Sequence, residues 1–232
     1  MIAKTPGVLT GIFALLKSVI LVAMVGGPVP FPPTDLSAAE SGNDTSIKSP
    51  LTSQHSQDFL LEKMIPLGDW RPFPKGGERD DWEAIKDHPL SKRRMEYLVG
   101  RAEALLGQPW PDLPATLYME YVRNGNRSRY QARYFDRREN LGVLVLAECF
   151  EHRGRFLDEI INGIWAICEE STWCVPAHAS RYSGDVLHRP DLQSLDLFAC
   201  ETGMTLASAL YLLEDELGAI SPAVPERIRL EV

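Results

Sequence analysis

Apolar side chains between residues 89 and 217 recur at spacings of three and four positions, which is the repeat of an α-helix. After Pro89 the repeat runs through Met95, Leu98, Ala102 and Leu105. No segment shows the alternation of a β-strand or the turn of a hairpin. The sequence therefore predicts an all-α fold with about five helices. Their expected ranges are 92–107, 115–123, 127–150, 155–170 and 192–217.

Two of these segments, Leu141–Cys149 and Ile160–Cys168, are apolar on more than one side. Each must then be covered by at least two neighbours, which favours a layered helical array over a small bundle. The closing stretch, Ser221–Val232, reads as the start of a further helix with proline in its first turn. The pattern is typical of a helical ring or solenoid, and we expect the chain to end inside an unfinished element.

The first 39 residues have the order of a secretory signal peptide. Lys4 precedes an apolar stretch from Val8 to Val25, and small residues follow at Ser37–Ala39. Lys17 interrupts the apolar run, so no stable membrane span is expected, although a signal-anchor is the alternative. Residues 40–85 are expected to be a leader and polar linker with little regular structure. The protein is thus predicted to be exported to the periplasm or the extracellular space.

Composition restricts the function mainly through charge. The chain carries a net charge of −8 at neutral pH, which argues against nucleic-acid binding because that function needs a basic surface. Arg129, Arg133 and Arg137 nevertheless share one helix face. They can attract an acidic glycan or pair with acids on neighbouring helices, and helix-on-helix packing favours the second interpretation.

The four cysteines show no zinc-ligand spacing, and glycine-rich phosphate loops and nucleophile elbows are missing from the sequence. We therefore expect no metal and no cofactor. One or two disulfides are conceivable in an exported protein, but buried free thiols are commoner on apolar helix faces. The disulfide status stays open for Cys149, Cys168, Cys174 and Cys200.

A helix end rich in carboxylates is followed closely by an indole and an imidazole. Glu169 and Glu170 close the segment 155–170, and Trp173 and His178 follow in a loop expected over Thr172–Pro190. Acids that accept hydroxyl hydrogen bonds and a ring that stacks on a sugar are typical of a carbohydrate-binding cleft. The alternative is structural: a core indole and a solvated helix terminus.

Four strings between Tyr118 and the end of the chain resemble the opening helices of heparinase II/III-like polysaccharide lyases. They are Gly125–Glu148, Gly154–His178 with its IWAICEESTW…PAH motif, Ser194–Leu213 and Pro222–Val232. The resemblance implies that residues 86–232 are the N-terminal part of an (α/α) toroid or helical-hairpin array, truncated in this chain. It implies that the whole protein performs β-elimination on a glycan containing uronic acid. It also implies that Glu170, Trp173 and His178 bind substrate. In that family the catalytic Tyr, a neutralising Asn and a β-sandwich domain come later, so the catalytic residues are unknown here.

The leading hypothesis is thus the N-terminal segment of an exported polysaccharide lyase, catalytically incomplete as given, whose partner is an acidic polysaccharide. The alternatives are an (α/α)-ring glycoside hydrolase, which would use Glu169 or Glu170, and a non-enzymatic carbohydrate-binding or scaffold protein.

Overall fold

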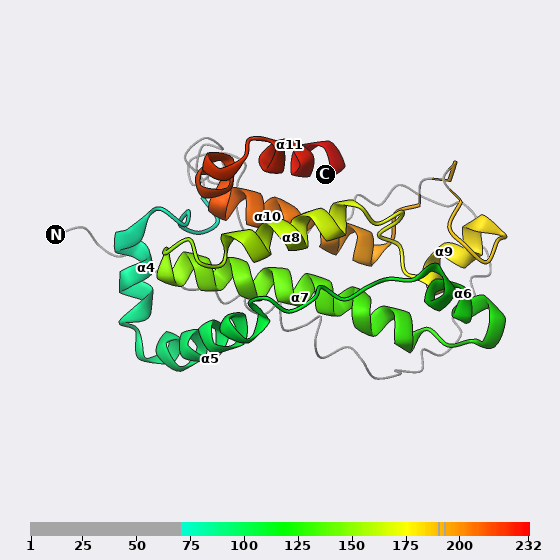
Figure 1. Ribbon diagram of the computed structural model, residues 1–232, viewed down its shortest axis with the longest axis horizontal. Helices are drawn as coiled ribbons and strands as arrows, with labels where there is room; N and C mark the ends of the chain where they lie inside the picture. Colours follow the sequence, from blue (N-terminus) through cyan, green and yellow to red (C-terminus); the bar gives the residue numbers. More distant parts are fainter. Residues whose placement is uncertain (1–70, 190, 193) are drawn as a thin grey trace, which may run out of the picture. The chain divides into compact units, whose positions relative to one another are not determined.

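The computed structural model describes residues 71–189, 191–192 and 194–232, and within them Phe73–Val232 belong to one unit. The expected signal peptide and most of the expected leader lie outside the described residues. Every regular element in the described part is an α-helix, which confirms the all-α prediction (Figure 1). The eight helices are α4 (Arg79–Lys86), α5 (Pro89–Leu105), α6 (Ala115–Asn124), α7 (Ser128–Glu151), α8 (Leu157–Cys168), α9 (Pro176–Ser183), α10 (Leu197–Ile220) and α11 (Ala223–Glu231).

Helix α7 is the centre of this unit. It contacts α4, α5, α6, α8 and α10, and α8 runs back along it (Figure 1). Its second half, from residue 143 to 150, is buried at every position. Helix α8 packs between α7, α10 and α11. The expectation that both apolar segments are covered by several neighbours is therefore confirmed.

The apolar side chains form two clusters. The main core lies between α4, α5, α7, α8, α10 and α11 and includes Leu141, Ile164 and Leu213. A smaller cluster, the distal core, joins α6, the start of α7, α9 and the start of α10. The distal core consists of Leu117, Tyr118, Tyr130, Tyr134, Cys174, Val175, Ala179 and Ala199. Trp173 packs against both clusters and so lies where they meet.

The helical unit begins earlier than the sequence analysis places it. The expected linker 40–85 includes most of α4, whose Trp82 and Ile85 are buried in the main core. The Trp82 indole also donates a hydrogen bond of 2.7 Å to the carbonyl oxygen of Lys75. Charged residues dominate this helix, and its two core residues fill one narrow face. Such a short stripe gives little periodic signal.

The expected loop over Thr172–Pro190 contains a second unexpected helix, α9. Pro176 occupies its first turn, where proline is compatible with a helix, and Gly184 ends it with a left-handed φ of 60°. The helix has two turns and few large apolar residues, so periodicity does not reveal it. Its position matters for function because it carries His178.

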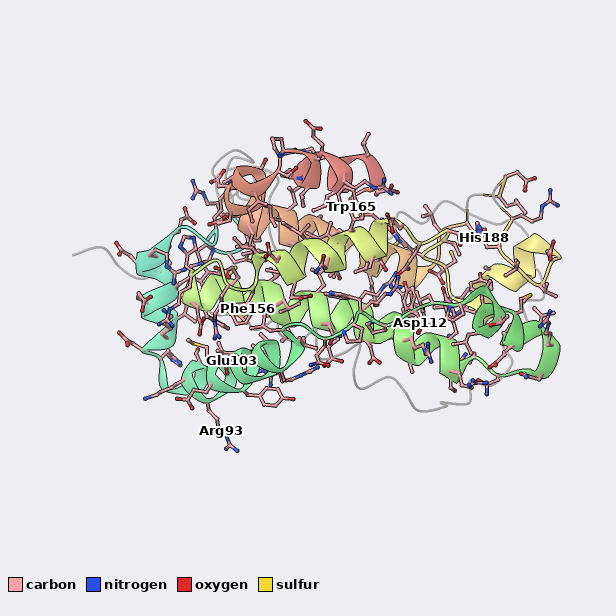
Figure 2. All side chains as sticks on the ribbon, in the orientation of Figure 1. Arg93, Glu103, Asp112, Phe156, Trp165 and His188 are labelled. Carbon is pink, nitrogen blue, oxygen red and sulfur yellow. The ribbon has the colours of Figure 1, made fainter. Side chains whose placement is uncertain are left out.

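Helix α11 confirms the helix expected from the closing stretch of the sequence. Its Arg227 donates a hydrogen bond of 2.7 Å to the carbonyl oxygen of Cys168, at the end of α8. The same guanidinium lies 5.8 Å from the ring centroid of Trp165, which Figure 2 labels between α8 and α11. None of the helices in the described part of the chain has the length and apolar character that a membrane crossing requires.

Candidate functional site

The three predicted substrate-binding residues lie along the connection between α8 and α10, but in different environments. Glu170 follows the last turn of α8, Trp173 lies in the turn after it, and His178 lies in α9. The connection reaches the end of the unit formed by α6, α9 and the first half of α7 (Figure 1). The structure does not turn all three side chains toward solvent.

Glu170 is buried in an ion-pair cluster. Arg138 donates two hydrogen bonds to its carboxylate, one of 2.8 Å to Oε1 and one of 2.6 Å to Oε2. Arg137 donates a third, of 3.0 Å, to Oε1. The Glu170 side chain is only 4% exposed. Both oxygens are thus bound by the protein, and the prediction that Glu170 contacts substrate is not supported by this geometry.

The arginines on one face of α7 form ion pairs with acidic residues of the same protein. Arg129 pairs with Glu120 of α6 at 2.6 Å, and Arg133 pairs with Asp112, which Figure 2 labels in the segment before α6. Arg137 pairs with Glu170. The interpretation that these arginines pair with the protein's own acids is confirmed, although only the partner of Arg129 lies on a helix; Asp112 and Glu170 lie in connections beside helices.

Trp173 is half-buried, and its indole is used by the fold. Its Nε1–H donates a hydrogen bond of 3.0 Å to the carbonyl oxygen of Ile167, in the last turn of α8. Its carbonyl oxygen accepts a hydrogen bond of 2.8 Å from the hydroxyl of Tyr134. Trp173 therefore fixes the course of the connection as well as bordering the distal core.

His178 is the predicted residue that reaches solvent. Its side chain is 40% exposed, and its Nδ1 lies 2.7 Å from Oδ2 of Asp196. The ring stacks on Phe198, with centroids 5.5 Å apart and an interplanar angle of 10°. A carboxylate only accepts hydrogen bonds, so Nδ1 carries the proton in this pair. Among the described residues, no hydrogen bond to Nε2 is found.

Asp196 is a functional candidate that the sequence analysis missed. Its Oδ1 accepts a hydrogen bond of 2.7 Å from the amide of Ala199, so it caps the N-terminus of α10. Its Oδ2 also accepts from the amide of Val175 at 3.3 Å. Aspartate before an apolar helix is a known cap signal, but the expected helix start at residue 192 conceals it. One carboxylate thus orders the helix start, the connection and the imidazole.

Tyr134 connects α7 with the segment that carries Trp173 and with the start of α10. Its hydroxyl oxygen lies 2.9 Å from Oγ1 of Thr202 and 2.8 Å from the carbonyl oxygen of Trp173. The guanidinium of Arg138 lies over the Tyr134 ring, 3.4 Å from the centroid, and its Nε donates to Thr202 Oγ1 at 3.0 Å. Burial raises the pKa of the Tyr134 hydroxyl to about 12.

The four cysteines are free thiols, and Cys200 alone among them is exposed. The Cys174 thiol donates a hydrogen bond of 2.9 Å to the carbonyl oxygen of Ser194, so it helps to hold the connection before α10. Within the described ranges, no three His, Cys, Asp or Glu side chains are grouped so that they can hold a metal ion.

A groove of about 670 Å³ lies elsewhere. It is bordered by α4, α5 and the end of α7, with Met95, Val99 and Phe150 among its lining residues. Glu103, labelled on α5 in Figure 2, also borders it. None of the three predicted site residues lines this groove.

Comparison with known proteins adds no assignment. No protein-family model matches the chain, and no curated protein matches it. The resemblance to heparinase II/III-like lyases therefore stays a prediction based on four sequence strings.

Proposed function

We propose that this chain is the N-terminal helical part of an exported polysaccharide lyase, acting by β-elimination on a glycan that contains uronic acid. The observation that carries the proposal is the imidazole of His178, which the largely buried carboxylate of Asp196 orients while the ring reaches solvent. The proposal places the glycan against this imidazole, at the end of the unit that carries α9.

The chemistry of uronate recognition suits such an imidazole. β-Elimination removes a weakly acidic proton beside a carboxylate, so the enzyme must stabilise the negative charge that develops there. With Nδ1–H directed at Asp196, the Nε2 atom of His178 can accept a hydrogen bond from a sugar hydroxyl or, once protonated, donate one to a carboxylate. The hydrogen bond to Asp196 and the stacking on Phe198 hold the ring in one orientation. The catalytic base is left unassigned.

The proposed fold is the beginning of an (α/α) toroid. The pairs α7–α8 and α10–α11 each run out and back along one another, as the hairpins of such an array do (Figure 1). The buried second half of α7 supports the proposal, because a helix surrounded by others suits a layered array.

The hydrolase alternative receives less support from the geometry. A glycosidase needs two carboxyl groups that face the scissile bond, and Glu170 is bound to two arginines instead. Glu169 is exposed, but this proposal names no second carboxyl group that would face the scissile bond together with it. A non-enzymatic carbohydrate-binding protein is the outcome expected if binding occurs without product.

Isothermal titration calorimetry with alginate, polygalacturonate and hyaluronan tests the binding step, with neutral dextran as the control glycan. We expect a uronate polymer to bind, and His178→Ala to weaken its binding by about tenfold, the loss that corresponds to one charge-assisted hydrogen bond. His88→Ala, at the junction of α4 and α5, should leave the affinity unchanged. Equal affinities for wild type and His178→Ala would overturn the proposed site.

The reaction type needs a separate measurement. Ultraviolet absorbance of the 4,5-unsaturated uronate, released from the same polymers by the complete gene product, identifies a lyase. New reducing ends without that absorbance identify a hydrolase. Binding with neither signal identifies a carbohydrate-binding or scaffold protein.

Export is part of the proposal and rests on residues 1–39, which lie outside the described residues. Mass spectrometry of the protein recovered from the culture medium or periplasm should show a chain that begins after Ala39. Recovery of the intact N-terminus in the membrane fraction would instead support the signal-anchor alternative.

A further inference from the structure

We infer that Glu170 is a positioning residue: together with Arg138 it fixes, through Thr202 and Tyr134, the connection that carries Trp173 and His178. The inference rests on the proposed function, because it explains how His178 is held toward the glycan. It gives Glu170 a role that differs from the substrate contact expected from the sequence.

The first step is the immobilised guanidinium of Arg138. Its two terminal nitrogens bind both oxygens of Glu170, and Nη1 also donates a hydrogen bond of 3.1 Å to the carbonyl oxygen of Tyr134. The guanidinium plane lies over the Tyr134 ring. A planar group held on two edges and one face has a single orientation, so the direction of its remaining N–H is fixed.

From Arg138 the hydrogen bonds continue through the hydroxyl groups of Thr202 and Tyr134. The Nε–H of Arg138 occupies one lone pair of the Thr202 oxygen, and Thr202 has one hydrogen to give. Tyr134 Oη and the carbonyl oxygen of Phe198 are both within reach of that hydrogen, at 2.9 Å and 2.8 Å. If Thr202 donates to Tyr134, the single hydrogen of Tyr134 is left for the carbonyl oxygen of Trp173, at 2.8 Å the nearer of its two backbone acceptors; that of Phe198 lies at 3.2 Å. Every donor in this relay then has an acceptor.

The relay holds two parts of the chain, the segment of Trp173 and the start of α10. At one end it fixes the backbone of Trp173, five residues before His178. At the other end Thr202 lies in the first turns of α10, which Asp196 caps and which carry Phe198. Asp196 and Phe198 are the two residues that orient the imidazole. The Glu170–Arg138 pair therefore controls both the segment that carries His178 and the surface against which its ring packs.

A purely structural ion pair and a positioning pair respond differently to double replacement. Removing one partner leaves a buried charge, whereas replacing both with apolar residues of similar size usually restores stability. We would therefore compare Glu170→Gln with the double variant Glu170→Met/Arg138→Met. The matched control is Arg101→Met/Glu139→Met, which removes a partly buried pair between α5 and α7.

Three measurements are made on each full-length variant: thermal unfolding, the NMR signals of the His178 ring, and affinity for the uronate polymer. We expect Glu170→Gln to unfold at a lower temperature. The double Met variant should recover in part, because Arg137 loses its carboxylate partner but keeps its hydrogen bonds to the carbonyl oxygens of Pro111 and Ala166. The recovered variant should still show shifted His178 signals and a loss of affinity of about tenfold or more, as expected for a misplaced group. The Arg101→Met/Glu139→Met control should change neither the His178 signals nor the affinity for the polymer.

Wild-type His178 signals and affinity in the double Met variant would overturn the inference. If that variant does not fold, Tyr134→Phe takes its place, since it breaks the relay without exposing a charge, and the same readouts decide. Failure of the proposed function looks different: the wild type then binds no uronate polymer. In that case the His178 signals alone show whether Glu170 positions the ring.

Discussion

The amide of Gly76 donates a hydrogen bond of 2.7 Å to the carbonyl oxygen of Leu212, just before α10 leaves helical geometry at Leu213. The segment before α4 is thereby tied to the bend in α10. The Tyr211 hydroxyl strengthens the tie by donating to the carbonyl oxygen of Phe73 at 2.8 Å. A side chain on Gly76 would enter this contact, because its Cβ would lie 2.8 Å from both Leu212 O and Leu213 Cδ2.

We expect Gly76→Ala to lower the free energy of unfolding by about 2 kcal/mol, because the carbonyl of Leu212 belongs to the backbone and has little freedom to move. Urea denaturation followed by circular dichroism measures the change. Gly77→Ala is the matched control, since its Cβ would approach nothing closer than Glu216 Oε1, at 3.7 Å. Equal losses for the two variants would contradict the packing argument.

At two glycines inside helices, replacement by alanine should change the stability in opposite directions. A Cβ on Gly163 of α8 would clash with the ring of Trp110, whose indole also donates a hydrogen bond of 3.1 Å to Glu159. A Cβ on Gly100 of α5 would meet nothing within 4 Å. Gly163→Ala should therefore cost about 1–3 kcal/mol of stability. Gly100→Ala should add up to about 1 kcal/mol through helix propensity.

Thermal unfolding of the two variants and the wild type tests both predicted stability changes in one experiment. The midpoint should fall for Gly163→Ala and rise for Gly100→Ala. A rise for both would mean that Trp110 moves aside without cost, and that its contact with α8 contributes little to stability.

The long helices can be predicted from the sequence because each presents several turns of the helical repeat to the core. Helices α4 and α9 cannot be predicted in this way, since each has two turns and α4 buries only Trp82 and Ile85. Tertiary contacts, such as that between Trp82 and Phe150, select these helices.

The candidate site was predictable to a similar degree. His178 could be singled out from its place after an acidic helix end, and it does reach solvent. Glu170 has the same signal, but its partners Arg137 and Arg138 lie 33 and 32 residues earlier on another helix. Neither such a pairing nor the Asp196 contact with His178 leaves a local pattern.

The cysteines should differ strongly in their reaction with N-ethylmaleimide. Cys200 is exposed, whereas burial raises the pKa of Cys168 and of Cys174 to about 11 and raises the pKa of Cys149 as well. A thiol whose pKa is raised in this way holds about a hundredfold less thiolate at neutral pH, and the thiolate is the reactive form. We expect Cys200 to be labelled first and Cys149 last.

Mass spectrometry of peptides from briefly labelled native protein gives this order, and labelling in urea confirms that all four thiols are present and reactive. Early labelling of Cys149 in the native protein would show that the main core opens readily near the end of α7.

Alkaline pH should destabilise the protein through its buried tyrosines. Burial raises the pKa of Tyr134 from 10.0 to about 12, and it also raises the pKa of Tyr118 and of Tyr130. Between these two values the folded state keeps the Tyr134 proton while the unfolded state loses it. The folded state then binds more protons, so raising the pH favours unfolding. The stability contributed by Tyr134 is complete below pH 10 and is lost as the pH rises to about 12.

Urea denaturation at a series of pH values between 8 and 12 tests this argument. A shift of two pKa units corresponds to about 3 kcal/mol, which sets the upper size of the Tyr134 contribution. Tyr134→Phe should be less stable than wild type at pH 8, because the carbonyl oxygen of Trp173 loses its donor. It should also lose less stability as the pH rises, so the two curves converge. Tyr97→Phe, at an exposed position on α5, should follow the wild-type curve in slope. Parallel curves for Tyr134→Phe and wild type would show that the Tyr134 hydroxyl does not keep its proton in the folded state at high pH.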